Sequence, residues 1–592
     1  MGSTLPGYTN TITTANTIKG NFKWKLNKLL QGLSVEGFAA YLKSEIDYKR
    51  FQRIWYVYSY DKSNEQYVPI RGGQESTTPY LQQQASKASS TTYNIKLAYQ
   101  QKFGKHTFDA FLAYEQNEGE GSNISASRRG YLTDQIEQLF AGSTVGLTND
   151  GSAYATARLN YFGRINYGYN NKYYLNVTMR YDGSQNFPHS NRFGFFPSVS
   201  ASWRISKENF MKNISFVNDL KIRASWGKMG NDAIPPFQYL ATYQYGLGYY
   251  FGQNPILNPG LILSRTPNEN ITWEVANSKN IGFEAVMFKN KLSLNFDYFK
   301  SVRDNILIKR NASVPDYTGL TLPDENIAKV SNSGFEVEAN YNDKIGNDFR
   351  FNIGGNISYA KNKIINIDES PNVPGYQKRT GYPIDANYLY QADGLFQNQA
   401  QIDKYPHLPN TAPGDIKYID INNDGKITAA DQIRTNVSPT PQVMYGANIG
   451  GNYKNWELTI FFQGQARANA TIMPVRLYEN KAFFEGRWQK EGDMLYPRAF
   501  VSNRDPIGVN ALPSTFWLKD ASFIRLKNVQ IAYNLPVGII KKIGISSTRV
   551  YISGTNLFTL DKIKILDPEN ANSNGEIYPL QRTVNLGINV TF

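Results

Sequence analysis

The sequence predicts an all-β protein, a transmembrane antiparallel β-barrel, from its composition, the alternation of its apolar residues and the spacing of its turns. Aromatic residues make up 14% of the 592 residues, with 41 Tyr and 33 Phe, yet the mean hydropathy is only -0.48. A barrel reconciles these properties because each strand puts alternate residues into lipid and into a wet lumen, with aromatic girdles at both interfaces. A large soluble β-rich protein, such as a lectin or an adhesin, is the alternative for this composition.

Composition also excludes several kinds of site. No apolar run approaches the roughly 18 residues of a membrane helix, so a crossing of the membrane must use strands. The chain has no cysteine and only three histidines, which excludes disulfides, thiol chemistry and zinc sites. Lys and Arg outnumber Asp and Glu by 63 to 49, but they are dispersed along the chain. No nucleic-acid partner is therefore expected.

The clearest strand is the last segment of the chain, Thr583–Phe592, in which polar and apolar residues alternate without a break. Successive side chains of a strand point to opposite faces, whereas a helix would scatter both sets around its circumference. The apolar set is Val584, Leu586, Ile588, Val590 and Phe592. One face of this strand is expected to meet lipid and the other to meet water.

Paired segments with the same alternation predict hairpins along the whole chain. Their turns are expected at 102–106, at Asn170 and Asn171, at 289–291, near Gly346 and at Lys454 and Asn455. Charged residues at the polar positions, such as Glu336 and Glu338, must line a wet interior. Lys or Arg near the bilayer midplane costs about 2 to 4 kcal/mol, and an acid somewhat less.

Long segments rich in Asn, Gly and Pro alternate with the tight turns. They are expected at about 118–156, 227–276, 303–332, 361–442 and 465–519. In barrels the short turns are periplasmic and the long loops extracellular, which gives about 17 strands with Phe592 in the periplasm. The count is odd, whereas bacterial single-chain barrels have even numbers, and no signal peptide follows Met1. We therefore expect the chain to be a portion of a longer protein.

Eight stretches carry a resemblance to a known family. They are Arg180–Trp203 (RYDGSQNFPHSNRFGFFPSVSASW), Arg223–Asn231 (RASWGKMGN), Ile271–Phe299 (ITWEVANSKNIGFEAVMFKNKLSLNFDYF), Val330–Glu338 (VSNSGFEVE), Pro413–Ile427 (PGDIKYIDINNDGKI), Leu518–Tyr533 (LKDASFIRLKNVQIAY), Tyr551–Phe558 (YISGTNLF) and Tyr578–Phe592 (YPLQRTVNLGINVTF). In this order they resemble the SusC/RagA family of TonB-dependent outer-membrane transporters, over essentially the whole chain.

The resemblance implies a barrel of about 22 strands that follows a signal peptide, a TonB-binding segment and a plug domain. Residues 1–592 would be the C-terminal portion of that barrel, about 17 of its 22 strands, with the plug and signal peptide missing. The terminal Phe592 fits the aromatic residue that the barrel-insertion machinery recognises in such proteins.

The resemblance also implies a function, the active import of an oligosaccharide or oligopeptide across the cell outer membrane. A SusD-like surface lipoprotein would cap the barrel, and TonB would act through the missing N-terminal part. The alternatives are a surface binding or adhesion barrel without transport, and a non-functional truncated fragment.

Residues 420–431, within the loop 361–442, match the spacing of a twelve-residue calcium loop, with Asp in place of the usual final Glu. The expected oxygen ligands come from Asp420, Asn422, Asp424, the Lys426 carbonyl, Thr428 and Asp431. A metal-free Asx turn is the alternative, because Asp-Gly and Asn-Asp pairs commonly form turns. A bound calcium ion would stiffen an extracellular loop.

The loop 227–276 is rich in aromatic residues. We expect substrate contacts from Tyr239, Tyr243, Tyr245, Tyr249, Tyr250 and Phe251, whose rings could stack on sugars or contact peptide side chains. Packing of loop on loop beneath a partner protein explains them equally well. Nucleophile elbows, phosphate-binding loops and groups of metal-binding histidines are not found in the sequence, so no catalytic residues and no enzyme activity are expected.

Overall fold

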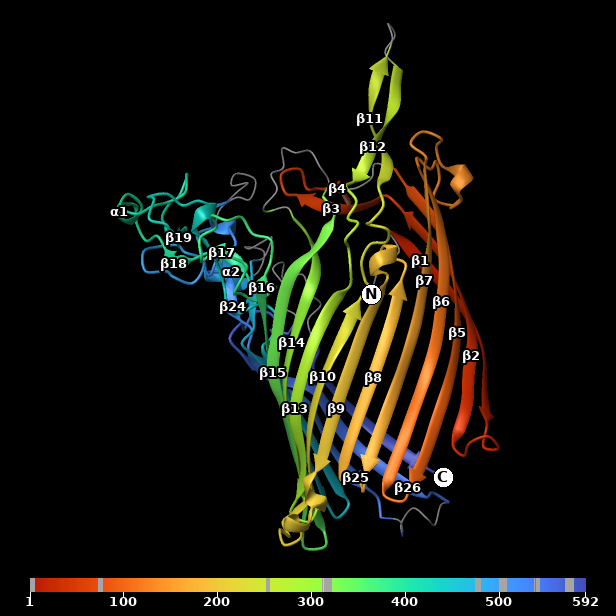
Figure 1. Ribbon diagram of the computed structural model, residues 1–592. Coiled ribbons are helices and arrows are strands. Elements are labelled where there is room, and N and C mark those ends of the chain that lie inside the picture. Colours follow the sequence, from red (N-terminus) through yellow and green to blue (C-terminus); the bar gives the residue numbers. More distant parts are fainter. Residues whose placement is uncertain are drawn as a thin grey trace. The chain divides into compact units, whose positions relative to one another are not determined.

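The computed structural model describes residues 6–72, 78–251, 256–310, 312, 322–473, 481–499, 508–536, 538, 544–569 and 580–592. Seventeen strands of this part belong to one hydrogen-bonded sheet, and further strands form five two-stranded sheets. The chain divides into two compact units. Figure 1 shows long strands as the dominant element. Within the described ranges, none of the helices has the length and apolarity needed to cross a membrane.

The first unit comprises residues 1–168, 176–197 and 232–237. Its consecutive strands pair antiparallel, β1 with β2, β2 with β5 and β5 with β6, while β3 and β4 form a separate hairpin. The strands that lie wholly or mostly in this unit are β1 (Gly7–Lys25), β2 (Leu33–Gln52), β3 (Trp55–Asp61), β4 (Gln66–Gly72), β5 (Tyr80–Phe103), β6 (His106–Arg129), β7 (Thr148–Tyr169) and β8 (Tyr173–Ser184).

The second unit comprises residues 169–175, 198–231 and 238–592. Its long strands pair antiparallel with their neighbours from β9 through to β27. They are β9 (Phe193–Arg204), which begins in the first unit, β10 (Val217–Asn231), β13 (Glu274–Met287), β14 (Leu292–Lys309), β15 (Asp324–Ile345), β16 (Phe349–Asn366), β21 (Val443–Tyr453), β22 (Trp456–Ala466), β25 (Phe523–Asn534), β26 (Ser547–Asp561) and β27 (Thr583–Thr591).

Shorter elements of the second unit lie in the connections between these strands. They are β11 (Thr242–Phe251), β12 (Ile256–Arg265), β17 (Tyr388–Tyr390), β18 (Ala392–Leu395), α1 (Gln399–Ile402), β19 (Ile416–Tyr418), β20 (Gln432–Arg434), β23 (Asn469–Thr471), α2 (Lys481–Glu485) and β24 (Leu518–Asp520).

The tight turns lie where the sequence predicts them. Asn170 and Asn171, between β7 and β8, both have positive φ, at 53° and 54°. A two-residue turn between right-twisted strands needs this conformation at both positions, and Asn tolerates it better than most residues. Gly346 (φ 64°) and Lys454 (φ 52°) make the corresponding turns after β15 and β21. The predicted hairpins are therefore confirmed.

The predicted loop boundaries are wrong in several places, because the strands continue beyond their apolar stretches. The connection predicted at 118–156 is only 130–147, since β6 continues to Arg129 and β7 begins at Thr148. Similarly, β14 reaches Lys309, whereas the connection after it was predicted to begin at about residue 303. A strand that continues beyond the lipid needs no apolar face, so its polar end looks like a loop in the sequence.

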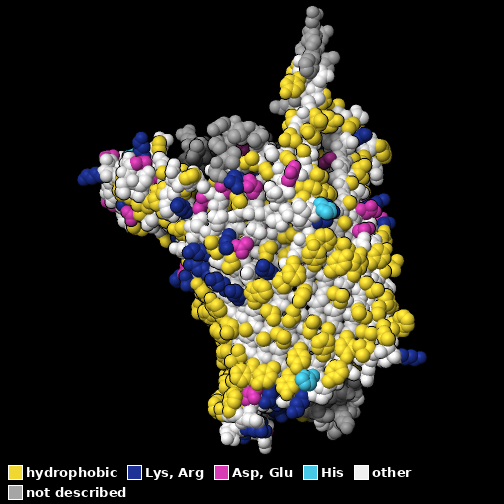
Figure 2. Space-filling view, in the orientation of Figure 1, with side chains coloured by type: hydrophobic (Ala, Val, Ile, Leu, Met, Phe, Trp, Pro, Cys, Tyr) yellow, Lys and Arg dark blue, Asp and Glu magenta, His cyan; other side chains and the backbone are white. Residues whose placement is uncertain are grey.

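The two faces of the sheet differ as the alternation predicts. On β13, β14 and β15 the residues Phe283, Phe296 and Val337 are in register, with the two phenyl rings stacked at 5.6 Å. Glu284 and Glu338 flank Asn295 and lie on the opposite face. Figure 2 shows hydrophobic side chains spread widely over one side of the molecule, with charged side chains gathered toward the edges of this field.

This difference between the faces can be tested with two neighbouring substitutions. We expect Phe296→Arg to lower the free energy of unfolding from lipid vesicles by about 2 to 4 kcal/mol, because it puts a guanidinium into hydrocarbon. Asn295→Arg should change it by less than about 1 kcal/mol, because its side chain faces Glu338 across the strands. Denaturant titration in vesicles measures both. Equal destabilisation by the two variants would contradict the assignment of the faces.

Candidate functional site: the loop assembly

Three connections of the second unit pack together around a hydrophobic core of their own. They follow β16, β22 and β26, and we call them the loop assembly. Their buried core consists of Tyr390, Leu395, Ile416, Tyr418, Ile427, Ala468, Ala470, Ile472, Phe483, Tyr496, Val509, Trp517, Ala521 and Ile563. The segment predicted as one long extracellular loop, 361–442, is thus partly a folded element with β17 to β20 and α1. Its packing against the other two connections was not predicted from the sequence.

A buried carboxylate ties two of these connections together. Asp415 has no exposed surface, and it accepts hydrogen bonds from Arg498 at 2.6 Å and 3.1 Å and from the Asn510 side chain at 2.8 Å. Its contacts match the acceptor capacity of an ionised carboxylate, which makes burial affordable. Arg498 and Asn510 lie more than eighty residues from Asp415 in the sequence. These hydrogen bonds therefore hold together the connections that follow β16 and β22.

The polar groups of two buried aromatic side chains nearby also have hydrogen-bond partners within this core. The Tyr418 hydroxyl donates to the Val509 carbonyl at 2.6 Å, and the Trp517 indole donates to the Asn510 carbonyl at 2.9 Å. Burial raises the pKa of the Tyr418 phenol far above its ordinary value, and the nearby Asp415 carboxylate acts in the same direction. The Tyr418 phenol therefore stays neutral and remains a hydrogen-bond donor across the physiological pH range.

The third connection is held to the sheet by a buried arginine. Arg525, on β25, has no exposed surface and pairs with Asp567 at 2.7 Å and Glu569 at 2.6 Å. The Arg525 guanidinium also donates to the Thr559 hydroxyl at 2.9 Å and lies over the Phe523 ring at 4.8 Å. Two carboxylates against one guanidinium keep the segment after β26 on the sheet, and the sequence offered no means of pairing these residues.

The predicted calcium loop lies inside this assembly, between β19 and β20. Asp420 accepts from the Asp424 and Gly425 amides at 3.2 Å and 2.8 Å, and Asp424 accepts from the Lys426 amide at 2.9 Å. Gly425 has φ 80°, which permits the sharp turn. The Asn422 side chain accepts from the Asp424 amide at 3.0 Å. The residues at the first, third and fifth positions therefore converge on one tight turn.

The end of the loop has a capping box. The Thr428 side chain accepts from the Ala430 amide at 3.2 Å, and the buried Asp431 accepts from the Thr428 and Ile421 amides at 2.8 Å and 2.9 Å. Ile427 is buried in the core of the loop assembly. Among the described residues, no three His, Cys, Asp or Glu side chains gather as closely as a metal site would require. The oxygen ligands of this loop are of the kind that calcium prefers. In this structure, however, the carboxylates of Asp420, Asp424 and Asp431 accept hydrogen bonds from backbone amides.

The predicted aromatic substrate contacts lie on the β11–β12 hairpin. Tyr243, Tyr245, Tyr249 and Tyr250 have exposed fractions of 64%, 81%, 66% and 67%. Tyr243 and Tyr245 pair with Leu263 and Leu261, so one face of the hairpin is apolar and open. Tyr239 is half-buried before β11, while Phe251 ends β11 and its side chain lies outside the described part. Open apolar surfaces of this kind are typical of sites that bind ligands or partners, and the predicted substrate contacts stay a prediction.

The hairpin is anchored at its base to the start of β15. Gln238 is buried and donates to the Asp324 side chain at 2.9 Å, and Asn268 donates to the Asp324 carbonyl at 2.7 Å. The Thr272 amide donates to the Asn326 side chain at 2.9 Å. These contacts position the root of the aromatic hairpin in the second unit while its tyrosines stay exposed.

The sequence analysis missed a second aromatic hairpin, formed by β3 and β4 in the first unit. Tyr56, Tyr58 and Tyr60 lie on one face, and Tyr60 contacts Tyr67 across the strands with ring centroids 5.2 Å apart. The turn is held by Asp61, which accepts from the Ser63 amide at 2.9 Å. Alternate tyrosines followed by Asp-Lys-Ser-Asn could have revealed it.

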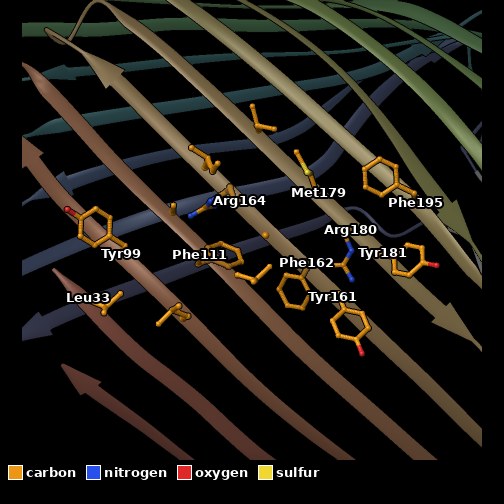
Figure 3. A pocket seen from close by; sticks show the side chains of 16 residues that line it. Leu33, Tyr99, Phe111, Tyr161, Phe162, Arg164, Met179, Arg180, Tyr181 and Phe195 are labelled. Carbon is orange, nitrogen blue, oxygen red and sulfur yellow. The ribbon is translucent and has the colours of Figure 1, made fainter. Parts of the chain in front are cut away.

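An apolar hollow of about 450 Å³ lies over β5 to β9 in the first unit (Figure 3). Leu97, Leu112, Met179 and Phe195 are among its lining residues, and Gly163 leaves room at its floor, where a Cβ would lie 2.9 Å from the Phe111 carbonyl oxygen. The hollow is on the face predicted to meet lipid. It suits hydrocarbon chains and is a poor candidate for a polar nutrient.

Comparison with known proteins agrees with these features. Residues 2–557 match the model of the family described as TonB dependent receptor-like, beta-barrel. The chain belongs to this family. The seventeen-stranded sheet confirms the predicted fold class, and the resemblance to SusC/RagA proteins is confirmed as well. The family is one of receptors and transporters, not of enzymes.

Individual relatives are consistent with this assignment. TonB-dependent receptor P3 of Formosa agariphila is 29% identical over 84% of this chain and 52% of its own length. TonB-dependent receptor SusC of Bacteroides thetaiotaomicron is 26% identical over 85% of this chain and 50% of its own length. The RagAB peptide transporter structure has a TM-score of 0.76 at 21% identity, over 99% of this chain and 62% of that one. The chain thus spans about half the length of the curated relatives it matches.

The ion pairs at Arg525 can be tested against an exposed pair nearby. Arg525→Met leaves Asp567 and Glu569 without a cation, and breaking a buried pair costs about 3 to 5 kcal/mol. Because the Asp567 and Glu569 side chains are 19% and 33% exposed, we expect the free energy of unfolding to fall by an amount near the lower end of that range. Limited proteolysis should then cut the segment 562–569.

The matched control is Lys562→Gln, which breaks the exposed pair with Asp520 at 2.8 Å. This substitution should cost less than about 1 kcal/mol and leave the segment protected. Unchanged protease resistance in Arg525→Met would contradict the anchoring role of Arg525.

Proposed function

We propose that this chain is the barrel part of a protein that imports a nutrient across the outer membrane in a TonB-dependent manner. The observation that carries the proposal is the family match over residues 2–557. Two relatives support it, one named a TonB-dependent receptor SusC and the other a peptide transporter. The cargo in this proposal is an oligosaccharide or oligopeptide, and the localisation is the outer membrane.

We further propose that the loop assembly and the β11–β12 hairpin face the cargo, together with a SusD-like surface lipoprotein. The exposed rings of Tyr243 and Tyr245 can stack on sugar faces or on peptide side chains. The packed core behind the loop assembly supports a pre-organised surface, which lowers the entropy lost on binding. We also propose that Phe592, which follows β27 and is 87% exposed, is the residue that the barrel-insertion machinery recognises.

Uptake by cells that produce the complete protein tests the proposal. We expect labelled oligosaccharides or oligopeptides to accumulate only while TonB is energised. Tyr243→Ser with Tyr245→Ser should raise the KM for uptake roughly tenfold, because two aromatic contacts are lost. Tyr243→Phe with Tyr245→Phe keeps both rings and should retain uptake.

Two outcomes would count against import. Surface binding without accumulation would favour the alternative of a binding or adhesion barrel. Neither binding nor accumulation of either cargo class, with the protein correctly inserted, would favour a non-functional fragment.

We also propose that residues 420–431 bind calcium after their carboxylates turn from backbone amides to the ion. The spacing of Asp420, Asn422 and Asp424 and the buried anchor Ile427 support this. The Lys426 carbonyl, Thr428 and Asp431 would complete the ligand set. Binding would link β19 to β20 and stiffen the loop assembly.

Calcium titration of the complete protein, followed by its thermal unfolding, tests this proposal. We expect calcium to raise the Tm, and Asp424→Asn to weaken binding by at least about tenfold, because a ligand charge is lost while an acceptor oxygen remains. Asp403→Asn, outside the twelve residues of the loop, is the control and should behave as the wild type. A wild-type Tm that ignores calcium would contradict the proposal.

A further inference from the structure

A row of lysines crosses the apolar face of the second unit. On β13 and β14, Lys279 lies directly opposite Lys300. Ser333 of β15 continues the row to Lys361 of β16. Residues paired across an antiparallel ladder point to the same side of the sheet. The three ammonium groups therefore lie on one face, and Lys279 and Lys300 are exposed.

Two further lysines adjoin this row on the same face. Lys363 of β16 lies opposite Ser331, and Lys228 of β10 lies opposite Asn277, two positions farther along each strand. Both lysines are exposed. Figure 2 shows Lys and Arg side chains gathered beside the hydrophobic field over these strands. We call the five residues, Lys228, Lys279, Lys300, Lys361 and Lys363, the lysine patch.

The lysine patch lies at the border of the apolar band. Two residues nearer the tight turns, the register runs through Ile281, Tyr298, Phe335 and Tyr359, with the last two rings 5.7 Å apart. From Leu292, beside the turn, to Lys300 the strand rises about 27 Å, or roughly 20 Å across a membrane at the usual tilt. The apolar band of a barrel is about 25 Å tall and ends in aromatic side chains. The backbone at Lys300 thus lies about 5 Å inside the loop-side border of the band, a distance that a lysine stem spans when it extends its ammonium group to the head groups.

The lysine patch has no internal charge compensation. Like charges directly opposite each other on a sheet are destabilising, as for Lys279 and Lys300. Within the described ranges, no carboxylate is paired with any of the five lysines. By contrast, the neighbouring Lys329 is paired with Asp304 at 2.7 Å. An external anion would remove the repulsion that the protein leaves uncompensated.

We propose that the lysine patch binds the phosphate groups of an anionic lipid in the outer leaflet. Lysine ammonium groups are point charges that suit phosphate oxygens. Free phosphate offers the same chemistry, but the adjoining aromatic and aliphatic face would hold the acyl chains of a lipid as well. The proposal rests on membership of the outer-membrane barrel family and is independent of the imported cargo.

The test measures binding of bisphosphorylated lipid A to the complete protein in detergent micelles. The triple variant Lys279→Gln, Lys300→Gln, Lys361→Gln should bind lipid A on the order of a hundredfold more weakly. Each lysine near an anionic head group strengthens binding by roughly fivefold, and the three factors multiply. The corresponding triple arginine variant should retain binding. The control triple Lys105→Gln, Lys212→Gln, Lys344→Gln, near the tight turns, should bind as the wild type.

Competition and folding controls make each outcome decisive. Inorganic phosphate at the lipid concentration should not displace lipid A, and phosphatidylcholine should not compete. Heat-modifiable migration on gels reports whether each variant is folded, and the arginine variant keeps the test valid if the glutamine variant is not. The proposal would be overturned if the glutamine variant bound lipid A with wild-type affinity, or if inorganic phosphate displaced lipid A equally well. It would also be overturned if the glutamine substitutions weakened the binding of an acidic protein partner but not the binding of lipid A. Failure of nutrient uptake would leave this titration unchanged.

Discussion

The whole structure depends on the pairing of backbone amides and carbonyls along unbroken antiparallel ladders. Hydrocarbon provides no partner for these groups, and an unpaired one costs several kcal/mol, so a chain that crosses a membrane by strands must pair them internally. The ladder of β5 and β6, for example, continues from Phe103 and His106 at the turn to Tyr80 and Arg129. Along such ladders successive side chains point to opposite faces, one apolar and one polar. This alternation explains why a chain rich in aromatic residues has a mean hydropathy of only -0.48.

The same constraint moves specific recognition to the ends of the strands. Alternation leaves the lumen face polar and the other face apolar, whereas the connections can fold without regard to lipid. Here three of them share a core that includes Trp517 and Phe483, tied by Asp415 to Arg498 and Asn510. Arg525 holds the last connection to the sheet through Asp567 and Glu569. The loop assembly is therefore a packed element, whereas the β11–β12 hairpin is anchored at its base and exposes its tyrosines.

Among the described residues, the lumen face of the second unit carries several ion pairs, whereas the five lysines of the lysine patch have no paired carboxylate. In the second unit the lumen face pairs Arg223 with Asp297 at 2.5 Å and Lys221 with Glu284 at 3.2 Å. On the apolar face, Lys279 and Lys300 stand opposite each other at the border of the aromatic residues. This difference is understandable if water and fixed carboxylates compensate the lumen lysines and a lipid head group compensates the outer ones.

The sequence by itself determined the strands, the facing of their residues and the tight turns, because period-two alternation and residues such as Asn170 and Asn171 act locally. It also placed the turn of residues 420–431 and the aromatic stretch of β11. Strand ends beyond the lipid, such as Arg129, were missed because a polar strand carries no alternation signal. Only the tertiary structure decided which loops share a core, that Arg525 meets Glu569, and that five lysines from four strands form one patch. Each of these depends on register between distant segments, which the periodicity of one segment does not record.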